Sequence, residues 1–341
     1  MFVQKSLLMP DLDAASSENV PMLEAADVVK VFPGQKFEFR REVVHEPHFY
    51  YLKFLPPSPV ICDVGGNVGQ SVRSIHLVKP NAKIYSFDIN PYVWPDLLEA
   101  GLRFGKNFQL FRHGLGEYDC LIVFYVPTIG DAAISTLGAV NLDDLRARNV
   151  RELLMGMADG APVKVFKMRS KIKRFDGLAL KPDFIKIDVE GHELEVLKGM
   201  QKTLESVRPD LLIENSHLDN VATYLSKFGY IPCGWSAEEE CLKIGYGHHN
   251  TIYIHAEKFY SIYRGDRNIV ANILDGVYNK YERPLSGEVT QSDVEAAFRT
   301  FFGSDPLPSQ VDVHVKAHRS RLALRNHFIK FLATRTRSNQ M

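Results

Sequence analysis

The stretch that most constrains the fold is residues 60–71, VICDVGGNVGQS, in which a short apolar run ends in an acid and leads into a glycine-dense turn. Beyond the turn, Val68, Val72 and Ile75 recur at the spacing of one helical face. With this order of strand, tight loop and helix start, an α/β sheet presents a ligand crevice beyond the carboxyl end of a strand. Glycine suits such a loop because it adopts unusual φ/ψ values and leaves no Cβ in the way of a ligand.

The spacing of the glycines separates two classes of ligand. The dinucleotide fingerprint G-x-G-x-x-G, started at Gly65, requires glycine at positions that Asn67 and Gln70 occupy. Instead, Asp63 ends the strand, and a carboxylate there suits a ligand whose loop-facing part is cationic or rich in donors. S-adenosylmethionine, with its amino group and sulfonium, is such a ligand, whereas a pyrophosphate is not. The alternative is a tight turn without a ligand.

The composition is that of an ordinary globular protein: 341 residues, 45% hydrophobic and 24% charged, without net charge. The neutral balance gives no support to nucleic-acid binding. Four cysteines without a C-x-x-C pair indicate free thiols in a reducing compartment. No apolar run approaches the roughly 20 residues of a membrane span, and residues 1–26 do not have the pattern of a secretory signal. We therefore predict a cytoplasmic protein.

A second apolar run, residues 83–91, also ends in an acid, Asp88, about 25 residues after Asp63. In a Rossmann-like fold, an acid at the end of the second strand hydrogen-bonds a ribose diol. The alternative is that Asp88 caps the helix that follows, since Asp and Asn are common caps. The two roles are compatible, because each needs only one carboxylate oxygen.

The third informative stretch, residues 182–193, crowds Asp188, Glu190, His192 and Glu193 at the carboxyl end of an apolar strand. Like charges this close raise at least one pKa, which favours a proton acceptor near neutral pH. The alternative is that the two glutamates lie in the first turn of the next helix and offset its dipole.

Strands that alternate with helices predict an α/β fold with a doubly wound, mainly parallel, Rossmann-like sheet. We expect this domain over residues 27–256, with a strand-containing preamble at 27–57, after a loose N-terminal arm at 1–26. Residues 142–157 and 194–204 are each predicted to form one helix.

The four motifs together resemble the FkbM-type methyltransferases, which use S-adenosylmethionine. The matching segments are residues 63–69 (DVGGNVG), 85–91 (YSFDINP), 185–199 (IKIDVEGHELEVLKG) and 212–214 (LIE). The resemblance extends over about residues 58–255, and the run IKIDVEG is its most family-specific part. It implies a class I methyltransferase sheet of about seven strands and methyl transfer to oxygen, often that of a sugar hydroxyl in glycans or natural products.

The resemblance also implies roles for individual residues. The methionine part of the cofactor would be held by Asp63, Gly65, Gly66, Asn67 and Gly69, and the ribose by Asp88. Two positions depart from the family pattern. Asp88 stands where Glu is more usual, and residues 167–169 (KMR) stand where the family shows Thr-Leu-Asp. Arg169 in place of that acid predicts a changed acceptor site that favours an anionic or phosphate-linked substrate.

Methyl transfer requires in-line alignment of the acceptor oxygen and the removal of one proton, and alignment is the larger contribution. Our candidates for the base are Asp188, Glu190 and His192, with Glu214 or His217 orienting. Carboxylates near a histidine also leave open a divalent cation that acidifies the hydroxyl. The spacing matches no recognised metal motif, so we assign no metal ligand.

From residue 257 on, the pattern changes, and residues 257–341 are predicted to form a helical, basic C-terminal module, with helices at 271–281 and 292–302. Residues 311–341 hold seven lysines and arginines against one acid, Asp312. A basic amphipathic helix can contact an anionic membrane surface peripherally or bind an anionic glycan. The alternative is a solvated basic face packed against an acidic core domain.

The sequence thus predicts a cytoplasmic S-adenosylmethionine-dependent O-methyltransferase that acts on a carbohydrate or glycan precursor. Two other classes stay open. One is a catalytically silent module that binds the cofactor without transferring its methyl group. The other is a nicotinamide-dependent oxidoreductase, although its phosphate loop is missing.

Overall fold

The computed structural model describes residues 30–31, 43–130, 132–134, 137–147, 149–238, 240–262, 288–302, 306–320, 323–324 and 327–328. The predicted N-terminal arm and the predicted helix at 271–281 lie outside these ranges. So does most of the predicted basic helix at the C-terminal end, where residues 323–324 and 327–328 are helical.

The larger sheet is mixed and has eight strands in the order β12-β11-β13-β10-β9-β2-β3-β4. The strands are β2 (Val60–Val64), β3 (Lys83–Phe87), β4 (Phe108–Phe111), β9 (Phe184–Ile187), β10 (Asp210–Glu214), β11 (Tyr230–Ser236), β12 (Cys241–Ile244) and β13 (Asn250–His255). The predicted α/β class is confirmed, with one strand more than the seven that the family resemblance implies. The chain divides into two compact units, residues 1–45, 57–180 and 187–201, and residues 46–56, 181–186 and 202–341.

The parallel strands of the first unit carry the predicted alternation. β2 pairs in parallel with β3, and β3 with β4. α1 (Gln70–Val78) follows β2, and α2 (Trp94–Gly101) with the 3-10 helix η3 (Leu102–Asn107) follows β3. All but the first residue of β2 and of β3 are buried, as expected for strands covered on both faces. These strands therefore end in a rigid layer, which can hold the loops that follow them.

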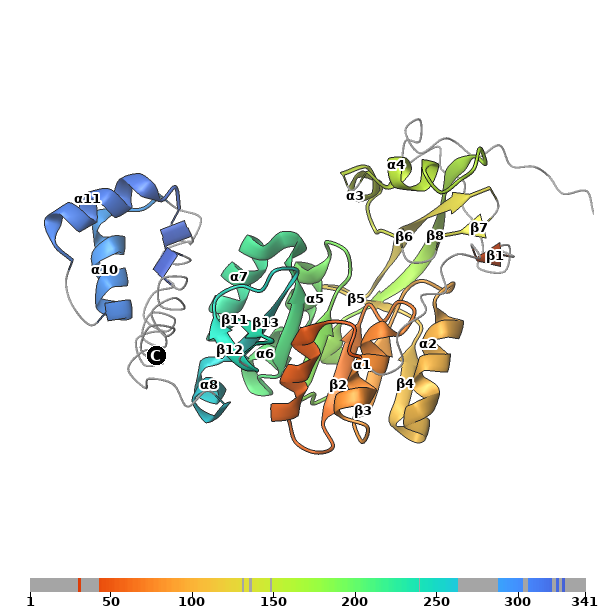
Figure 1. Cartoon of the computed structure of the whole chain (residues 1–341), viewed down its shortest axis with the longest axis horizontal. Helices are drawn as coiled ribbons and strands as arrows, with labels where there is room; N and C mark the ends of the chain where they lie inside the picture. Colours follow the sequence, from red (N-terminus) through yellow and green to blue (C-terminus); the bar gives the residue numbers. More distant parts are fainter. Residues whose placement is uncertain are drawn as a thin grey trace, which may run out of the picture. The chain divides into compact units, whose positions relative to one another are not determined.

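A second, five-stranded sheet in the first unit was not predicted at this size. Its order is β1 (Lys30–Val31), β7 (Ala132–Ala133), β6 (Cys120–Ile129), β8 (Val163–Lys173) and β5 (Gly114–Leu115). β6 and β8 pair antiparallel over ten residues. The sequence predicts two shorter strands here, a hairpin-type strand at 121–126 and an alternating one at 163–168, which lie within β6 and β8. Figure 1 shows α3 (Leu142–Ala147) and α4 (Val150–Met155) beside these two strands.

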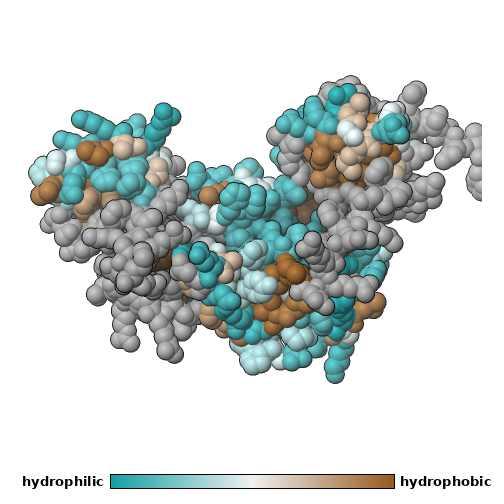
Figure 2. All heavy atoms as spheres, viewed as in Figure 1, coloured by the Kyte–Doolittle hydropathy of each residue, from teal (hydrophilic) through white to brown (hydrophobic). Residues whose placement is uncertain are grey.

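The predicted helix at 142–157 is two helices, because Asn149 between α3 and α4 is left-handed with φ 50°. Leu142, Leu145, Val150 and Leu154 are buried in one core cluster with β6 and β8. Leu153, Met155 and Met157 are exposed, and Figure 2 shows apolar surface over this part of the first unit. The predicted helix at 194–204 is likewise divided, into α5 (Glu193–Gly199) and α6 (Gln201–Ser206).

The second unit contains β10 to β13 in antiparallel pairs, together with the 3-10 helix η2 (Pro47–Phe54), α7 (Leu218–Ser226) and α8 (Ala256–Ile262). It also contains α10 (Gln291–Phe302), close to the predicted helix at 292–302, and α11 (Pro308–Ala317). The preamble predicted at 27–57 contains the helix η2 and, among its described residues, only the two-residue strand β1. None of the helices that the structure describes has both the length and the apolar character of a membrane span. All four cysteines are free thiols.

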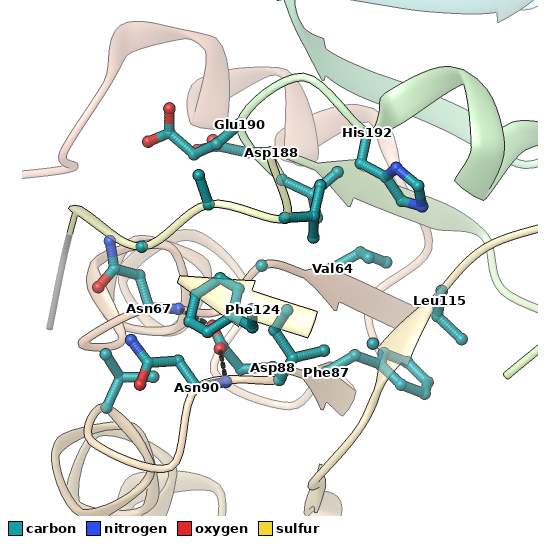
Figure 3. Close-up of a pocket in the computed structure, with 18 of the residues that line it drawn as sticks. Val64, Asn67, Phe87, Asp88, Asn90, Leu115, Phe124, Asp188, Glu190 and His192 are labelled. Carbon is teal, nitrogen blue, oxygen red and sulfur yellow. Dashed lines mark hydrogen bonds between the residues drawn. The ribbon is translucent and has the colours of Figure 1, made fainter. Parts of the chain in front are cut away.

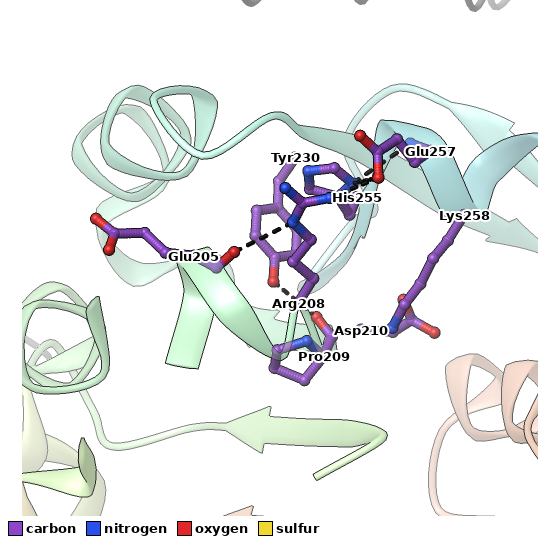
Figure 4. Close-up of polar contacts among 8 residues, drawn as sticks. All are labelled: Glu205, Arg208, Pro209, Asp210, Tyr230, His255, Glu257 and Lys258. Atoms are coloured by element: carbon purple, nitrogen blue, oxygen red, sulfur yellow. Dashed lines mark hydrogen bonds and ion pairs between the residues drawn. The ribbon is translucent and has the colours of Figure 1, made fainter. Parts of the chain in front are cut away.

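A cluster of polar contacts around Asp210 and His255 lies in the second unit (Figure 4). Lys258 lies 3.6 Å from one oxygen of Asp210, and the hydroxyl of Tyr51 donates to the other at 2.8 Å. The ring of His255 is 1% exposed, lies edge-on to Tyr230, and accepts the backbone N–H of Glu257 at 3.4 Å. Burial, and to a lesser extent the charge of nearby Arg208, lowers the pKa of His255 to about 4.

This histidine makes the stability of the fold sensitive to acid. Because the folded pKa of His255 lies below the unfolded value of about 6.5, its neutral ring stabilises the fold above that pH, and this contribution is lost as the pH falls towards 4. The expected loss from this group is on the order of 3 kcal/mol. In urea titrations between pH 7 and pH 4, the free energy of unfolding of His255→Gln should therefore fall less steeply than that of the wild type. His248→Gln, at an exposed histidine, should keep the wild-type slope, and equal slopes for all three proteins would contradict the assignment.

Candidate active site

A pocket lies at the carboxyl ends of β2 and β3, with about 740 Å³ of space between its walls, open solvent included. Its walls are mostly apolar, with polar groups from three loops, and every lining residue belongs to the first unit. They are Val64, Gly65, Asn67, Phe87, Asp88, Ile89, Asn90, Val93, Gly114, Leu115, Phe124, Gly138, Ala139, Val140, Ile172, Asp188, Val189, Glu190 and His192.

The loop that follows β2 requires glycine because its neighbours leave no room for a side chain. Gly65 has φ +80°, and a Cβ placed on it would lie 1.8 Å from the carbonyl oxygen of Asp188. Its N–H donates to the carbonyl of Phe87 at 2.9 Å, which ties the loop to the end of β3. Gly69 has φ +85° and lies against Ala100 of α2. The loop therefore takes its tight course from the contacts that surround it.

Asp63 lies beneath this loop and does not line the pocket. It is fully buried, and its two oxygens accept hydrogen bonds from the hydroxyls of Ser71, at 2.7 Å, and Ser86, at 2.8 Å. A Cβ on Gly66 would lie 2.4 Å from the Ser86 hydroxyl, so the loop packs directly on this group. This placement favours a supporting role for Asp63 over the direct cofactor contact that the family resemblance implies. Gly66 and Gly69 do not line the pocket either.

Asp88 lies in the pocket wall with both carboxylate oxygens oriented by backbone. The N–H groups of Asn67 and Asn90 donate to Oδ2 and Oδ1, each at 2.8 Å, as Figure 3 shows. The predicted role as a cap of the following helix is wrong, because the N-cap of α2 is Val93 and no side chain caps that helix. The loop contacts of Asp88 are compatible with a ligand role, because a carboxylate oxygen has more than one acceptor position. Asp88 is thus held rigidly where a diol could donate to it.

The residues present fit S-adenosylmethionine. Asn67 has φ 46°, and its Oδ1 is buried without a hydrogen-bond partner among the described residues. Such an atom is costly unless a donor reaches it, and the amino group of a methionine part is a suitable donor. The apolar walls formed by Phe87, Phe124 and Leu115 suit a flat heteroaromatic ring.

The acidic turn after β9 brings three of the predicted catalytic residues to the pocket. Asp188, Glu190 and His192 lie along one edge, across from Asp88 (Figure 3). The backbone turns tightly there, with φ 58° at Glu190. Burial lowers the pKa of His192, and the carboxylate of Glu195, 3.7 Å from its Nδ1, opposes this effect.

Glu193, the fourth titratable group of this stretch, stabilises the turn and does not line the pocket. It is fully buried, and its Oε1 accepts the N–H groups of Val189 and Gly191, each at 3.1 Å. Burial raises the pKa of its carboxyl, although these hydrogen bonds act in the opposite direction. The four titratable residues of this stretch therefore divide into two groups. Glu193 holds the turn, whereas Asp188, Glu190 and His192 line the pocket.

Three other residues that the sequence singled out lie elsewhere. Glu214 ends β10 and His217 follows it in the second unit, and neither is among the pocket-lining residues. Arg169 is exposed on β8, next to Met168, which packs with Phe124. Because neighbouring side chains of a strand point to opposite faces, Arg169 points away from the pocket side. The predicted effect of Arg169 on the acceptor site is thus not supported by its position.

The walls from the second sheet were missed by sequence reasoning. Phe124 of β6 and the segment Gly138, Ala139 and Val140 line the pocket. A Cβ on Gly138 would lie 2.1 Å from the Phe124 ring, so these walls are in close contact. The small residues of 130–142 are the available signal in the sequence, but by themselves they favour a loop without a function.

Comparisons with known proteins identify the domain that carries this pocket. Residues 63–232 match the methyltransferase FkbM domain. The methyltransferase sdnD of Sordaria araneosa is 30% identical over 203 residues, which cover 54% of this chain and 77% of that protein. The chain belongs to the FkbM methyltransferase family. All the pocket-lining residues fall within its FkbM domain. Membership agrees with the predicted fold class and with S-adenosylmethionine as the cofactor.

Two further methyltransferases match this chain over a smaller part of their own length. The hexuronic acid methyltransferase AglP of Haloferax volcanii is 29% identical over 151 residues, 43% of this chain and 52% of that protein. The crystal structure of a methyltransferase FkbM from Methylobacillus flagellatus KT is 16% identical, covers 61% of this chain and 50% of that one, and has a TM-score of 0.39. The chain thus spans about half the length of these two proteins.

Proposed function

We propose that this chain is an S-adenosylmethionine-dependent O-methyltransferase that acts on a hydroxyl of a sugar, a glycan or a glycosylated natural-product precursor. The observation that carries the proposal is that one pocket holds a carboxylate oriented for a ribose, Asp88, and three groups that can accept a proton, Asp188, Glu190 and His192. The similarity to a hexuronic acid methyltransferase supports a sugar acceptor.

The cofactor supplies a methyl group that is already activated on a sulfonium. Asp88 would accept hydrogen bonds from the ribose hydroxyls, and Oδ1 of Asn67 one from the amino group. The protein then contributes alignment, which is worth up to about 7–11 kcal/mol when reacting groups are well oriented. The rigid loop at Gly65 and the buried support of Asp63 serve that alignment.

Among the three acceptors of a proton, His192 is the general base that we favour. Its pKa is lowered by burial, so the imidazole is neutral at physiological pH and can take the proton of an acceptor hydroxyl. Glu195, 3.7 Å from Nδ1, would stabilise the imidazolium that forms. Asp188 and Glu190 would hold the acceptor hydroxyls by hydrogen bonds.

Replacing this base should affect turnover and spare cofactor binding. We expect His192→Gln to lower kcat by about 10²–10⁴, with the Kd for the cofactor unchanged within about twofold. His76→Gln is a matched control, because His76 is also half-buried with a lowered pKa but lies on α1 outside the pocket. Steady-state rates and calorimetry would measure both effects. If His192→Gln kept the wild-type turnover, one of the two carboxylates would be the base instead.

The function itself is tested with methyl-labelled cofactor and a panel of acceptors. The panel holds nucleotide sugars and oligosaccharides, in matched forms with a hexuronic acid or a neutral hexose. We expect label in a sugar product that survives mild alkali, because a methyl ether is stable there while a methyl ester of a uronic acid is hydrolysed. Cofactor binding without transfer to any acceptor would instead indicate a silent binding module, and binding of NADH in place of the cofactor an oxidoreductase.

A further inference from the structure

Three histidines outside the pocket meet in the C-terminal part of the second unit. They are His314 on α11, His318 directly after α11, and His327 in the short helical segment that follows. One ring nitrogen from each lies within 4.8 Å of the others. In the residues that the structure describes, this is the group of histidine, cysteine and acidic side chains that comes together closely enough to hold a metal ion.

We propose that His314, His318 and His327 form a zinc-binding site with water in the fourth coordination position. Imidazole nitrogen is a preferred ligand of Zn²⁺, and a purely imidazole set disfavours the oxygen-seeking Mg²⁺ and Ca²⁺. The site is separate from the methyl-transfer chemistry and does not rest on the function proposed above.

The separation of the ring nitrogens fits tetrahedral coordination. Nδ1 of His314 and Nε2 of His318 are 3.3 Å apart. Two ligands of a tetrahedral zinc with Zn–N bonds of about 2.0–2.1 Å are separated by about 3.3–3.4 Å. His314 lies in the last turn of α11, and His318 is its C-cap with extended backbone. The ring centroid of His327 lies 4.8 Å from that of His318 and 5.2 Å from that of His314. One of its nitrogens lies within 4.8 Å of the other two ligand atoms, so His327 must move closer to complete the set.

The surroundings also suit a metal. The rings of Phe298 and Phe328 lie 5.6 Å and 5.0 Å from that of His314 and shield the cluster on one side. Burial lowers the pKa values of His314 and His318, which keeps both rings neutral, as zinc ligands must be.

Zinc here would join α11 to the segment that follows it. In the described part of the C-terminal helices the buried apolar side chains are few, namely Val289, Val294, Phe298, Val311, Leu324 and Phe328. A metal cross-link commonly stabilises helices that share few apolar contacts, as the described residues do here. His327 is close to Leu324 and Phe328 in the sequence, so coordination would hold both residues against α11.

The test uses the full chain without a histidine tag, stripped of metal with a chelator. Titration with ZnCl₂ in a calorimeter should show one saturable site per chain. His318→Ala and His327→Ala should each weaken binding by more than about tenfold, since even the loss of a second-shell partner costs about 10–100-fold. Because His327 is exposed, its replacement should leave the far-UV circular dichroism unchanged. His248→Ala, at an exposed histidine of the same unit, should bind zinc like the wild type.

A second measurement reports the geometry. Co²⁺ added to the metal-free wild type should give the intense visible absorption of a tetrahedral ion, and His327→Ala should lose it. Absence of saturable zinc binding in the wild type would overturn the proposal. An equal loss of zinc affinity in His248→Ala would also overturn the proposal, and so would the weak visible absorption of octahedral Co²⁺. Each result would indicate non-specific contact of the metal with surface histidines.

Discussion

Gly65→Ala is expected to abolish measurable cofactor binding and to lower the free energy of unfolding by about 2–5 kcal/mol. Two effects add. The residue has φ +80°, which costs an alanine about 1–2 kcal/mol. The new Cβ would also lie 1.8 Å from the carbonyl oxygen of Asp188, and because that atom belongs to the backbone directly after β9, the loop itself must move.

Movement of this loop also displaces the groups that would bind the cofactor. Asn67 follows two residues later, and its N–H holds one oxygen of Asp88. Calorimetry with S-adenosylhomocysteine and urea denaturation of the same preparation would measure both losses.

Gly160→Ala separates the clash from the conformational cost. Gly160 has the same φ of +80°, but nothing lies within 4 Å of a Cβ placed there. Its replacement should cost only about 1–2 kcal/mol and leave cofactor binding intact. Equal effects of the two replacements would show that the close approach to Asp188 does not matter.

Asp88→Ala is expected to weaken binding of the cofactor product by at least about 100-fold. Hydrogen bonds to a charged group contribute about 1.5–3 kcal/mol each, and a ribose diol would make two of them. The replacement also leaves the N–H groups of Asn67 and Asn90 without their acceptor, which loosens the loop. Titration with S-adenosylhomocysteine would show the effect as a change in Kd.

Asp119→Ala is the matched control for Asp88. Its carboxylate also accepts a backbone N–H, that of Arg174 at 2.7 Å, and binds Lys173, but it lies on the surface outside the pocket. It should retain the wild-type Kd. If Asp88→Ala also kept that Kd, Asp88 would only hold the backbone of the loop and would not bind the cofactor.

Local sequence was sufficient for those elements whose neighbours in the sheet are also close in the chain. β2, its glycine loop, α1 and β3 follow one another within residues 60–87, and each was predicted from apolar periodicity and turn residues. The lengths of β6 and β8 were not predicted, because their pairing joins Cys120 to Ile172 across a long insertion. The break at Asn149 was hidden within a continuous apolar helical pattern.

The same division applies to the site. Asp88, Asp188, Glu190 and His192 were found from their positions at strand ends, and all four line the pocket. Asp63 has the same kind of position, yet its carboxylate points into the core toward two hydroxyls. The alternation along a strand predicts only that successive side chains point to opposite faces of the sheet. Which of the two faces binds the ligand depends on the elements that cover the sheet.

What the sequence by itself determined is the α/β class, the family and the chemical character of the cofactor-binding edge, because these depend on short motifs with local geometry. Only the tertiary structure decided which acids face the pocket, that Phe124 and Gly138 close it, and that His314, His318 and His327 meet. Each of these depends on contacts between residues distant along the chain, whose free energies no local pattern encodes.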